Sequence, residues 1–152
     1  MTIAYVGLGA NLDDRRATID QAVELLAAAE GVELLAVSSL RETDPVGFED
    51  QPRFLNGAAA VETSLTPGEL LAVLLGIERR LGRTREGPRF GPRVIDLDLL
   101  VHGDSVLDEP GLTVPHPRLH ERRFALEPLA ELAPGLVVPG RGTVEELLRG
   151  LH

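Results

Sequence analysis

Asp96 and Asp98 are the two residues whose type and spacing most directly suggest chemistry. They lie in residues 94–100, where apolar and acidic side chains alternate. Alternate side chains of a β-strand share a face, so both carboxylates are expected on one face, about 7 Å apart along the strand. Hard divalent cations such as Mg²⁺ prefer carboxylate oxygens, and two aspartates can hold a metal pair that also binds phosphates. The alternative interpretation is a half-exposed strand with a solvated acidic face.

Six arginines precede this strand in residues 79–93, which contain one acid, Glu86. A guanidinium group matches the geometry of phosphate oxygens and keeps its charge at any relevant pH. Beside the two aspartates this segment indicates a nucleotide-phosphate site, although an arginine-rich loop by itself is more often a solvated surface. The glycines and prolines of residues 87–92 suggest a loop that closes over a ligand and excludes water. The arginines are Arg79, Arg80, Arg83, Arg85, Arg89 and Arg93.

Four further residues could contact a nucleotide or a flat heterocycle. Phe54 and Asn56 are expected on one face of a strand, where the ring could stack and the amide could read a heterocycle edge; core packing is the alternative for Phe54. His116 lies between two prolines in a turn, where it could contact a phosphate or a ribose, or lie on the surface. Glu78 borders the buried stripe of a predicted helix and could meet the arginines or a nucleotide, with an exposed glutamate as the alternative.

Hydrophobic periodicity predicts six regular elements that would position these residues. The clearest is a helix that opens at a capping box of Thr66 and Glu69 and ends at Gly82. The order strand, helix, strand, strand, helix, strand is that of a ferredoxin-like α+β sandwich, an antiparallel sheet with helices over one face. The predicted elements are strand 3–8, a helix that opens near residues 11–14, strands 32–43 and 54–63, helix 66–82 and strand 94–101.

Two other segments complete this outline. Gly7-Leu8-Gly9 superficially resembles a dinucleotide fingerprint, but the third glycine is missing and the order of elements does not give a parallel sheet, so we reject that interpretation. After residue 102, prolines limit the chain to turns and extra short helices. The last of these helices opens at a second capping box, formed by Thr143 and Glu146.

Composition narrows the class of protein. The 152 residues, 43% of them apolar, are expected to form one domain over residues 1–152 with a proper core. The absence of cysteine excludes disulfide scaffolds and thiol nucleophiles, and the absence of lysine excludes a Walker-type phosphate loop and Schiff-base chemistry. A net charge of −9 and few aromatic residues argue against nucleic-acid partners. Neither a membrane span nor a secretory signal is expected, so the cytoplasm is the predicted location.

Five segments of this sequence resemble, in their order along the chain and in their spacing, the 6-hydroxymethyl-7,8-dihydropterin pyrophosphokinase family of folate biosynthesis. The resemblance covers nearly the whole chain, and residues 91–99 followed by 114–118 are its most specific part. It implies that the terminal diphosphate of ATP is transferred to the hydroxymethyl group of the pterin, with release of AMP. It also implies a monomer whose partners are small molecules. The matching segments are residues 7–12, 43–47, 51–56, 91–99 and 114–118.

The resemblance further implies roles for individual residues. Asp96 and Asp98 would hold two Mg²⁺ ions, and Arg83 and Arg93 would join them in catalysis. The pterin ring would lie between Phe54 and Phe124. The residues that would contact ATP are Glu78, Arg83, Arg85, Arg93, Leu99, Thr113, His116 and Arg122. The residues that would contact the pterin are Thr43, Asp44, Pro45, Val46, Phe54, Asn56, Phe90 and Phe124.

Three positions depart from the family pattern, and each puts one contact in question. Leu75 replaces a frequent glutamine near the adenine or ribose, Gly111 replaces an arginine near the phosphates, and Phe90 stands where tryptophan is frequent. Two other functions stay open at this point. One is a ferredoxin-like module that senses nucleotides without turning them over. The other is an RNA-binding sheet, which the net charge and the scarcity of aromatic residues disfavour.

Overall fold

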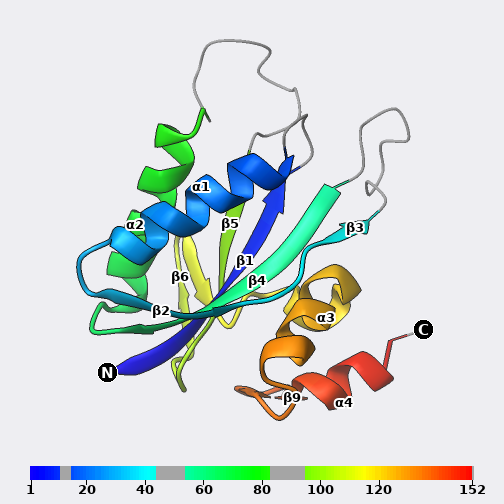
Figure 1. The fold of residues 1–152 in the computed structure, drawn as a ribbon. Helices are drawn as coiled ribbons and strands as arrows, with labels where there is room; N and C mark the ends of the chain where they lie inside the picture. Colours follow the sequence, from blue (N-terminus) through cyan, green and yellow to red (C-terminus); the bar gives the residue numbers. More distant parts are fainter. Residues whose placement is uncertain (11–14, 44–53, 83–94, 152) are drawn as a thin grey trace.

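A central antiparallel sheet organises the structure, a computed structural model that describes residues 1–10, 15–43, 54–82 and 95–151 (Figure 1). Its first elements are β1 (Thr2–Ala10), α1 (Arg15–Ala28), β2 (Val32–Val37), β3 (Arg41–Thr43), β4 (Phe54–Thr63), α2 (Pro67–Arg80) and β5 (Asp96–His102). The strand order is β2-β4-β1-β5, and β3 also pairs with β4. All of these pairings are antiparallel. The predicted ferredoxin-like α+β fold is therefore confirmed.

Helix α2 begins as its sequence predicts. Thr66 Oγ1 accepts a hydrogen bond from the backbone N–H of Glu69 at 3.1 Å, and Glu69 Oε1 accepts one from the N–H of Thr66 at 2.9 Å. The capping box thus satisfies amide groups that the first turn of a helix leaves without partners. Leu70 and Leu74 are fully buried in the core. Gly82, beyond the helix, has a φ of +107°, which glycine adopts without the steric cost of a Cβ atom.

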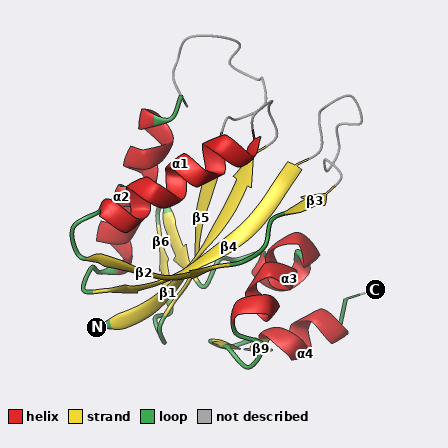
Figure 2. Cartoon of the chain, viewed as in Figure 1, coloured by secondary structure: helices red, strands yellow, loops and turns green. Residues whose placement is uncertain are grey.

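The sheet carries a hydrophobic core on each of its faces. Figure 2 shows α1 and α2 on one side of the sheet and the C-terminal helices on the other. Helices α1 and α2 cover the first face, where Val6 of β1 packs in one cluster with Ile19 and Leu74. Tyr5 of β1 belongs to the second core, on the face covered by the C-terminal helices. The prediction that the two helices of the ferredoxin-like unit cover one face is therefore confirmed, and the C-terminal helices, for which no place was predicted, cover the other face. The apolar run of β1 was a signal for this, because a strand that is buried on both faces is apolar throughout.

Beyond β5 the described chain forms two small hairpins, a 3₁₀ helix and two α-helices. These elements are β6 (Leu107–Glu109), β7 (Leu112–Val114), the 3₁₀ helix η1 (Leu119–Glu121), α3 (Arg123–Leu132), β8 (Val137–Val138), β9 (Gly142–Thr143) and α4 (Val144–Arg149). Turns and short helices are the predicted content, but Pro128 lies inside α3, where its missing N–H removes the helical bond to the carbonyl of Phe124. The capping box of Thr143 and Glu146 is confirmed at the start of α4. Within the described residues, none of the helices combines the length and the apolar character needed to span a membrane.

The predicted strand over residues 32–43 is divided in the structure. β2 ends at Val37 and β3 begins at Arg41, and residues 38–40 cross between them. In this crossing Leu40 packs over Gly57 of β4, where an added Cβ atom would lie 2.6 Å from Leu40 Cδ2. Ser38 Oγ accepts a hydrogen bond from the backbone N–H of Ala58 at 2.9 Å. Contacts with β4 therefore interrupt the strand, and the pattern of residues 32–43 alone does not reveal them.

Candidate functional site

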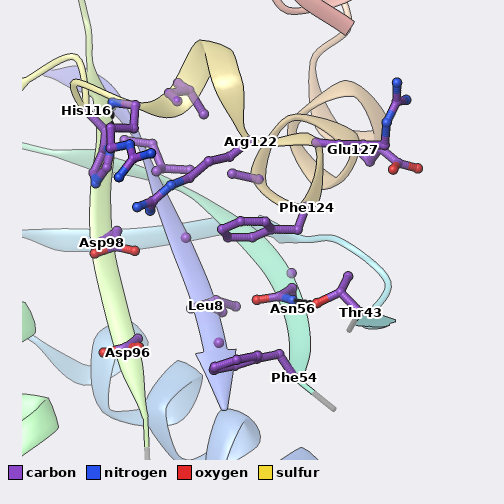
Figure 3. Close-up of a pocket in the computed structure, with 18 of the residues that line it drawn as sticks. Leu8, Thr43, Phe54, Asn56, Asp96, Asp98, His116, Arg122, Phe124 and Glu127 are labelled. Atoms are coloured by element: carbon purple, nitrogen blue, oxygen red, sulfur yellow. Dashed lines mark hydrogen bonds between the residues drawn. The ribbon is translucent and has the colours of Figure 1, made fainter. Parts of the chain in front are cut away.

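A pocket of about 640 Å³ opens on the second face of the sheet, the face that the C-terminal helices cover (Figure 3). Its floor comes from β1, β4 and β5, with Thr43 of β3 at one side. Its opposite wall comes from residues 116–127, which include η1 and the first half of α3. The pocket therefore lies between segments that are distant in the sequence.

Asp96 and Asp98 both line this pocket and are half-buried. Leu97 and Leu99, which alternate with them along β5, lie in the core on the opposite face. The predicted shared face of the two carboxylates is confirmed. Figure 3 shows both of them on β5, on the same side of the pocket.

The donor set at this strand fits Mg²⁺. Within the part of the chain that the structure describes, no group of three or more histidine, cysteine or acidic side chains could hold an ion. Mg²⁺ usually keeps several of its waters and is held by one or two carboxylates together with substrate phosphates. Asp96 and Asp98 supply that number of carboxylates on the pocket face.

Gly7 and Gly9 of β1 form a flat floor between the aspartates and β4. In the register of the sheet, Asp96 pairs with Gly9, and Gly9 pairs with Asn56. A Cβ atom at position 9 would lie 3.0 Å from Asn56 Oδ1, so a side chain there would disturb the amide. No role for these glycines is predicted from the sequence. Their spacing of two residues in a strand, which puts both on one face, was the signal that could have identified them.

The β4 end of the pocket is suited to a flat polar ring. Asn56 is almost completely buried, and its Nδ2 donates a hydrogen bond to Thr43 Oγ1. This bond directs Asn56 Oδ1 over Gly9, where it can accept a hydrogen bond from a ligand. Figure 3 shows the ring of Phe124 above the level of Asn56 and the ring of Phe54 below it, and all three residues line the pocket.

The opposite end of the pocket is basic. Arg122 extends toward Asp98 (Figure 3), and its guanidinium carbon lies 5.5 Å from the centroid of the Phe124 ring, a cation–π contact. Arg118 also lines the pocket, although no individual role for it is predicted from the sequence. Its place in the His116-Pro117-Arg118 segment was the available signal.

His116 is held as a neutral donor between these arginines. Burial lowers the pKa of His116 below its usual value, and the positive charges of Arg122 and Arg118 lower it further. Its Nδ1 accepts a hydrogen bond from the backbone N–H of Arg118 at 3.2 Å, so the ring proton lies on Nε2. The backbone N–H of His116 donates to the carbonyl of Leu100 at 2.9 Å, which fastens this turn to β5.

Three of the residues expected to contact ATP do not line the pocket that the described residues form. Glu78 is buried, and its Oε2 accepts a hydrogen bond from the backbone N–H of Leu97 at 2.8 Å. The side chain of Leu99 lies in the core, and Thr113 Oγ1 donates to Asp108 Oδ1 at 3.3 Å. Their contacts with ATP stay predictions. The candidates that lie outside the described residues are Asp44, Pro45, Val46, Arg83, Arg85, Phe90 and Arg93.

Two enzymes of the same name are similar in sequence to most of this chain. The 2-amino-4-hydroxy-6-hydroxymethyldihydropteridine pyrophosphokinase of Methylorubrum extorquens is 49% identical over 151 residues, which cover 99% of this chain and 94% of the relative. The enzyme of the same name from Bacillus subtilis is 52% identical over 130 residues, which cover 86% of this chain and 77% of the relative.

The fold is also shared with solved structures. A crystal structure of HPPK-DHPS in complex with substrates has a TM-score of 0.77 at 13% identity. The match covers 97% of this chain and 43% of the HPPK-DHPS chain. A Plasmodium falciparum HPPK-DHPS structure has a TM-score of 0.75 at 15% identity, and the match covers 45% of that chain. The family model described as 7,8-dihydro-6-hydroxymethylpterin-pyrophosphokinase (HPPK) matches residues 5–134. This chain therefore belongs to the 7,8-dihydro-6-hydroxymethylpterin-pyrophosphokinase family.

Proposed function

We propose that this protein transfers diphosphate from ATP to 6-hydroxymethyl-7,8-dihydropterin, as the names of its relatives indicate for them. The hydroxyl oxygen of the pterin forms a bond to the β-phosphorus of ATP. The bond from that phosphorus to the oxygen that bridges to the α-phosphorus breaks, AMP leaves, and the hydroxyl proton is released. Such a transfer needs positioning and charge stabilisation more than covalent help from the protein.

One observation carries this proposal: the carboxylates of β5 and the amide of Asn56 share one sheet face, with only Gly9 between them. A metal–phosphate site at these carboxylates and a site for a flat heterocycle at Asn56 would therefore be adjacent. A reaction between a nucleotide and a heterocyclic alcohol requires this adjacency.

Asp96 and Asp98 would hold two Mg²⁺ ions, which when bound neutralise phosphate charge and align the phosphates for in-line displacement. His116 would donate from Nε2, and Arg122 and Arg118, which line the pocket, would present their guanidinium groups to the phosphate oxygens. Arg83, Arg85 and Arg93 would complete the phosphate site, with Arg83 and Arg93 nearest the group in transfer. Glu78, Leu99 and Thr113 would complete the nucleotide site.

The pterin would lie between Phe54 and Phe124, where both of its faces contact an aromatic ring. Asn56 Oδ1 would accept a hydrogen bond from an N–H group of the heterocycle. The backbone of Thr43 and the segment from Asp44 to Val46 would read the rest of its edge, and Phe90 would cover it. We further propose that residues 1–152 act as one domain, in a cytoplasmic monomer.

Product analysis tests the function directly. The purified protein is incubated with ATP, Mg²⁺ and the reduced hydroxymethyl pterin, and AMP and the pterin diphosphate are separated by chromatography. Equal amounts of both products are expected when all three components are present, and neither when any one is left out. AMP release without the pterin would contradict the proposal. ATP binding without any turnover would instead identify a nucleotide-sensing module.

A further inference from the structure

Two carboxylates of α3 bind the chain segment that leads into β3. Glu131 Oε2 accepts a hydrogen bond from the backbone N–H of Ser39 at 2.7 Å, and its Oε1 accepts one from Ser39 Oγ at 2.6 Å. Arg41 Nη2 donates to Glu131 Oε1 at 3.2 Å. Arg41 Nη1 donates to Glu127 Oε2 at 3.4 Å. We call these four residues the β3–α3 clamp.

The charges within α3 itself disfavour acidic side chains at Glu127 and Glu131. Glu127 and Glu131 are four residues apart, so their like charges repel each other across one turn of the helix. Glu131 also lies in the last turn, where the negative end of the helix dipole disfavours an anion, and no basic residue lies in that turn. The hydrogen bonds from Ser39 and the charge of Arg41 nevertheless hold the pKa of Glu131 below its usual value. The contacts with Ser39 and Arg41 therefore offset the unfavourable local charges.

The clamp joins the two walls of the pocket. Arg41 is paired with Asn56 in the sheet, and Thr43, two residues further along β3, accepts the hydrogen bond of Asn56. On the other side, α3 carries Phe124 in its first turn, and Glu127 itself lines the pocket. The first turn of α3 lacks one helical hydrogen bond because of Pro128, so contacts outside the helix contribute more to its position.

We propose that the β3–α3 clamp is a positioning device that sets the spacing between the Thr43–Asn56 wall and Phe124. This inference rests on the proposed function, since that spacing is where the pterin would bind. The three charged residues of the clamp are partly exposed and Ser39 is exposed, and exposed ion pairs add little to folding stability. The effect of the clamp should therefore fall on binding of the pterin rather than on folding or on ATP.

Steady-state kinetics of Glu131→Ala, Arg41→Met and the double variant test the proposal. The KM for the pterin is expected to rise about 5-fold in Glu131→Ala, with kcat and the KM for ATP within about 2-fold of wild type. The double variant is expected to raise the KM for the pterin by less than the product of the two single effects, because both changes break contacts of one device. Glu131→Gln retains an acceptor for the N–H of Ser39 and should restore part of the loss.

A matched control removes an arginine elsewhere. Arg141 is exposed in the turn between β8 and β9 and does not line the pocket, so Arg141→Met should leave every constant unchanged. Dissociation constants for the pterin, measured by its fluorescence with a non-hydrolysable ATP analogue, provide a readout that does not depend on turnover. Thermal unfolding shows whether each variant is folded.

The outcomes separate this inference from the function on which it rests. An active wild type with an unchanged pterin KM in Glu131→Ala would overturn the clamp alone. An equal loss of activity toward both substrates, in step with a lower melting temperature, would also overturn it, since that indicates a purely structural role. A wild type that neither turns over nor binds the pterin would overturn both the function and the clamp.

Discussion

The buried carboxylate of Glu78 accepts a hydrogen bond from the backbone N–H of Leu97, the residue between Asp96 and Asp98. β5 is the outer strand of the order β2-β4-β1-β5, so β1 satisfies only one of its edges. Helix α2 thus supplies an acceptor where a neighbouring strand would otherwise pair. The strand that carries both candidate metal ligands is held on one side by β1 and on the other by a helix side chain.

Glu78→Leu is expected to lower the free energy of unfolding by about 1–3 kcal/mol, because it leaves the buried N–H of Leu97 without this acceptor. Glu78→Gln keeps a carbonyl oxygen at the same place and should lose less. Urea denaturation of both variants at neutral pH measures the difference. Equal losses in the two variants would show that the hydrogen bond to Leu97 is not what matters at this position.

Gly9→Ala should raise the KM for the pterin by about 10-fold, since the new Cβ atom would lie against Asn56 Oδ1 and displace the amide. Gly7→Ala adds the same methyl group to the same floor, beside Asp98 rather than Asn56, and serves as the comparison. There the added Cβ atom would lie 3.4 Å from Leu100 Cδ1, an ordinary contact with a flexible side chain. Comparable KM values in the two variants would contradict the proposed role of Gly9 as a floor for the heterocycle.

Asp96→Asn and Asp98→Asn should each reduce turnover by about 100-fold or more while the protein stays folded, because each removes a charged ligand from the phosphate-facing strand. Titration with Mn²⁺, followed by electron paramagnetic resonance, should show weaker ion binding in both variants. Asp104→Asn removes an exposed carboxylate just beyond β5 and serves as the charge-matched control. Wild-type ion affinity in the double Asp96/Asp98 variant would remove these residues from the metal site.

We expect the ring of His116 to take up a proton when the nucleotide binds. Its pKa lies below the usual value of 6.5 in the free protein, so the ring is mainly neutral just below that pH. Phosphate charge beside the ring offsets the effect of Arg122 and Arg118 and raises the pKa, so binding should take up a proton in that range. Calorimetry in two buffers with different ionisation enthalpies measures the uptake. His116→Asn should abolish it, and an uptake that persists in this variant would assign the proton to another group.

Local patterns in the sequence predicted much of the fold and part of the site. Strand 54–63 has the predicted bounds, and the capping box at Thr66 places α2 correctly, because these signals depend on neighbouring residues alone. The alternation around Asp96 and Asp98 likewise predicted which side chains share the pocket face. The hydrophobic period of a segment and its capping residues are local properties, so they can be identified from the sequence without knowledge of the fold.

The features that sequence analysis missed depend on contacts between distant residues. Ser39 and Glu131 are 92 residues apart, and no local pattern relates them. The break between β2 and β3 follows from the packing of Leu40 over Gly57, and the second core follows from where α3 and α4 dock. The role of Gly9 becomes visible only when its register with Asp96 and Asn56 is known.

That register also fixes a distance across the pocket. The backbones of Asp96 and Asn56 are two strand spacings apart, with Gly9 between them, which is about 10 Å and is set by the hydrogen bonding between the strands. No exchange of side chains can lengthen or shorten it. A variant that accepts a larger or smaller second substrate would have to change the side chains that surround this part of the sheet. A single inhibitor that binds at both ends of the pocket would need a linker of the same length.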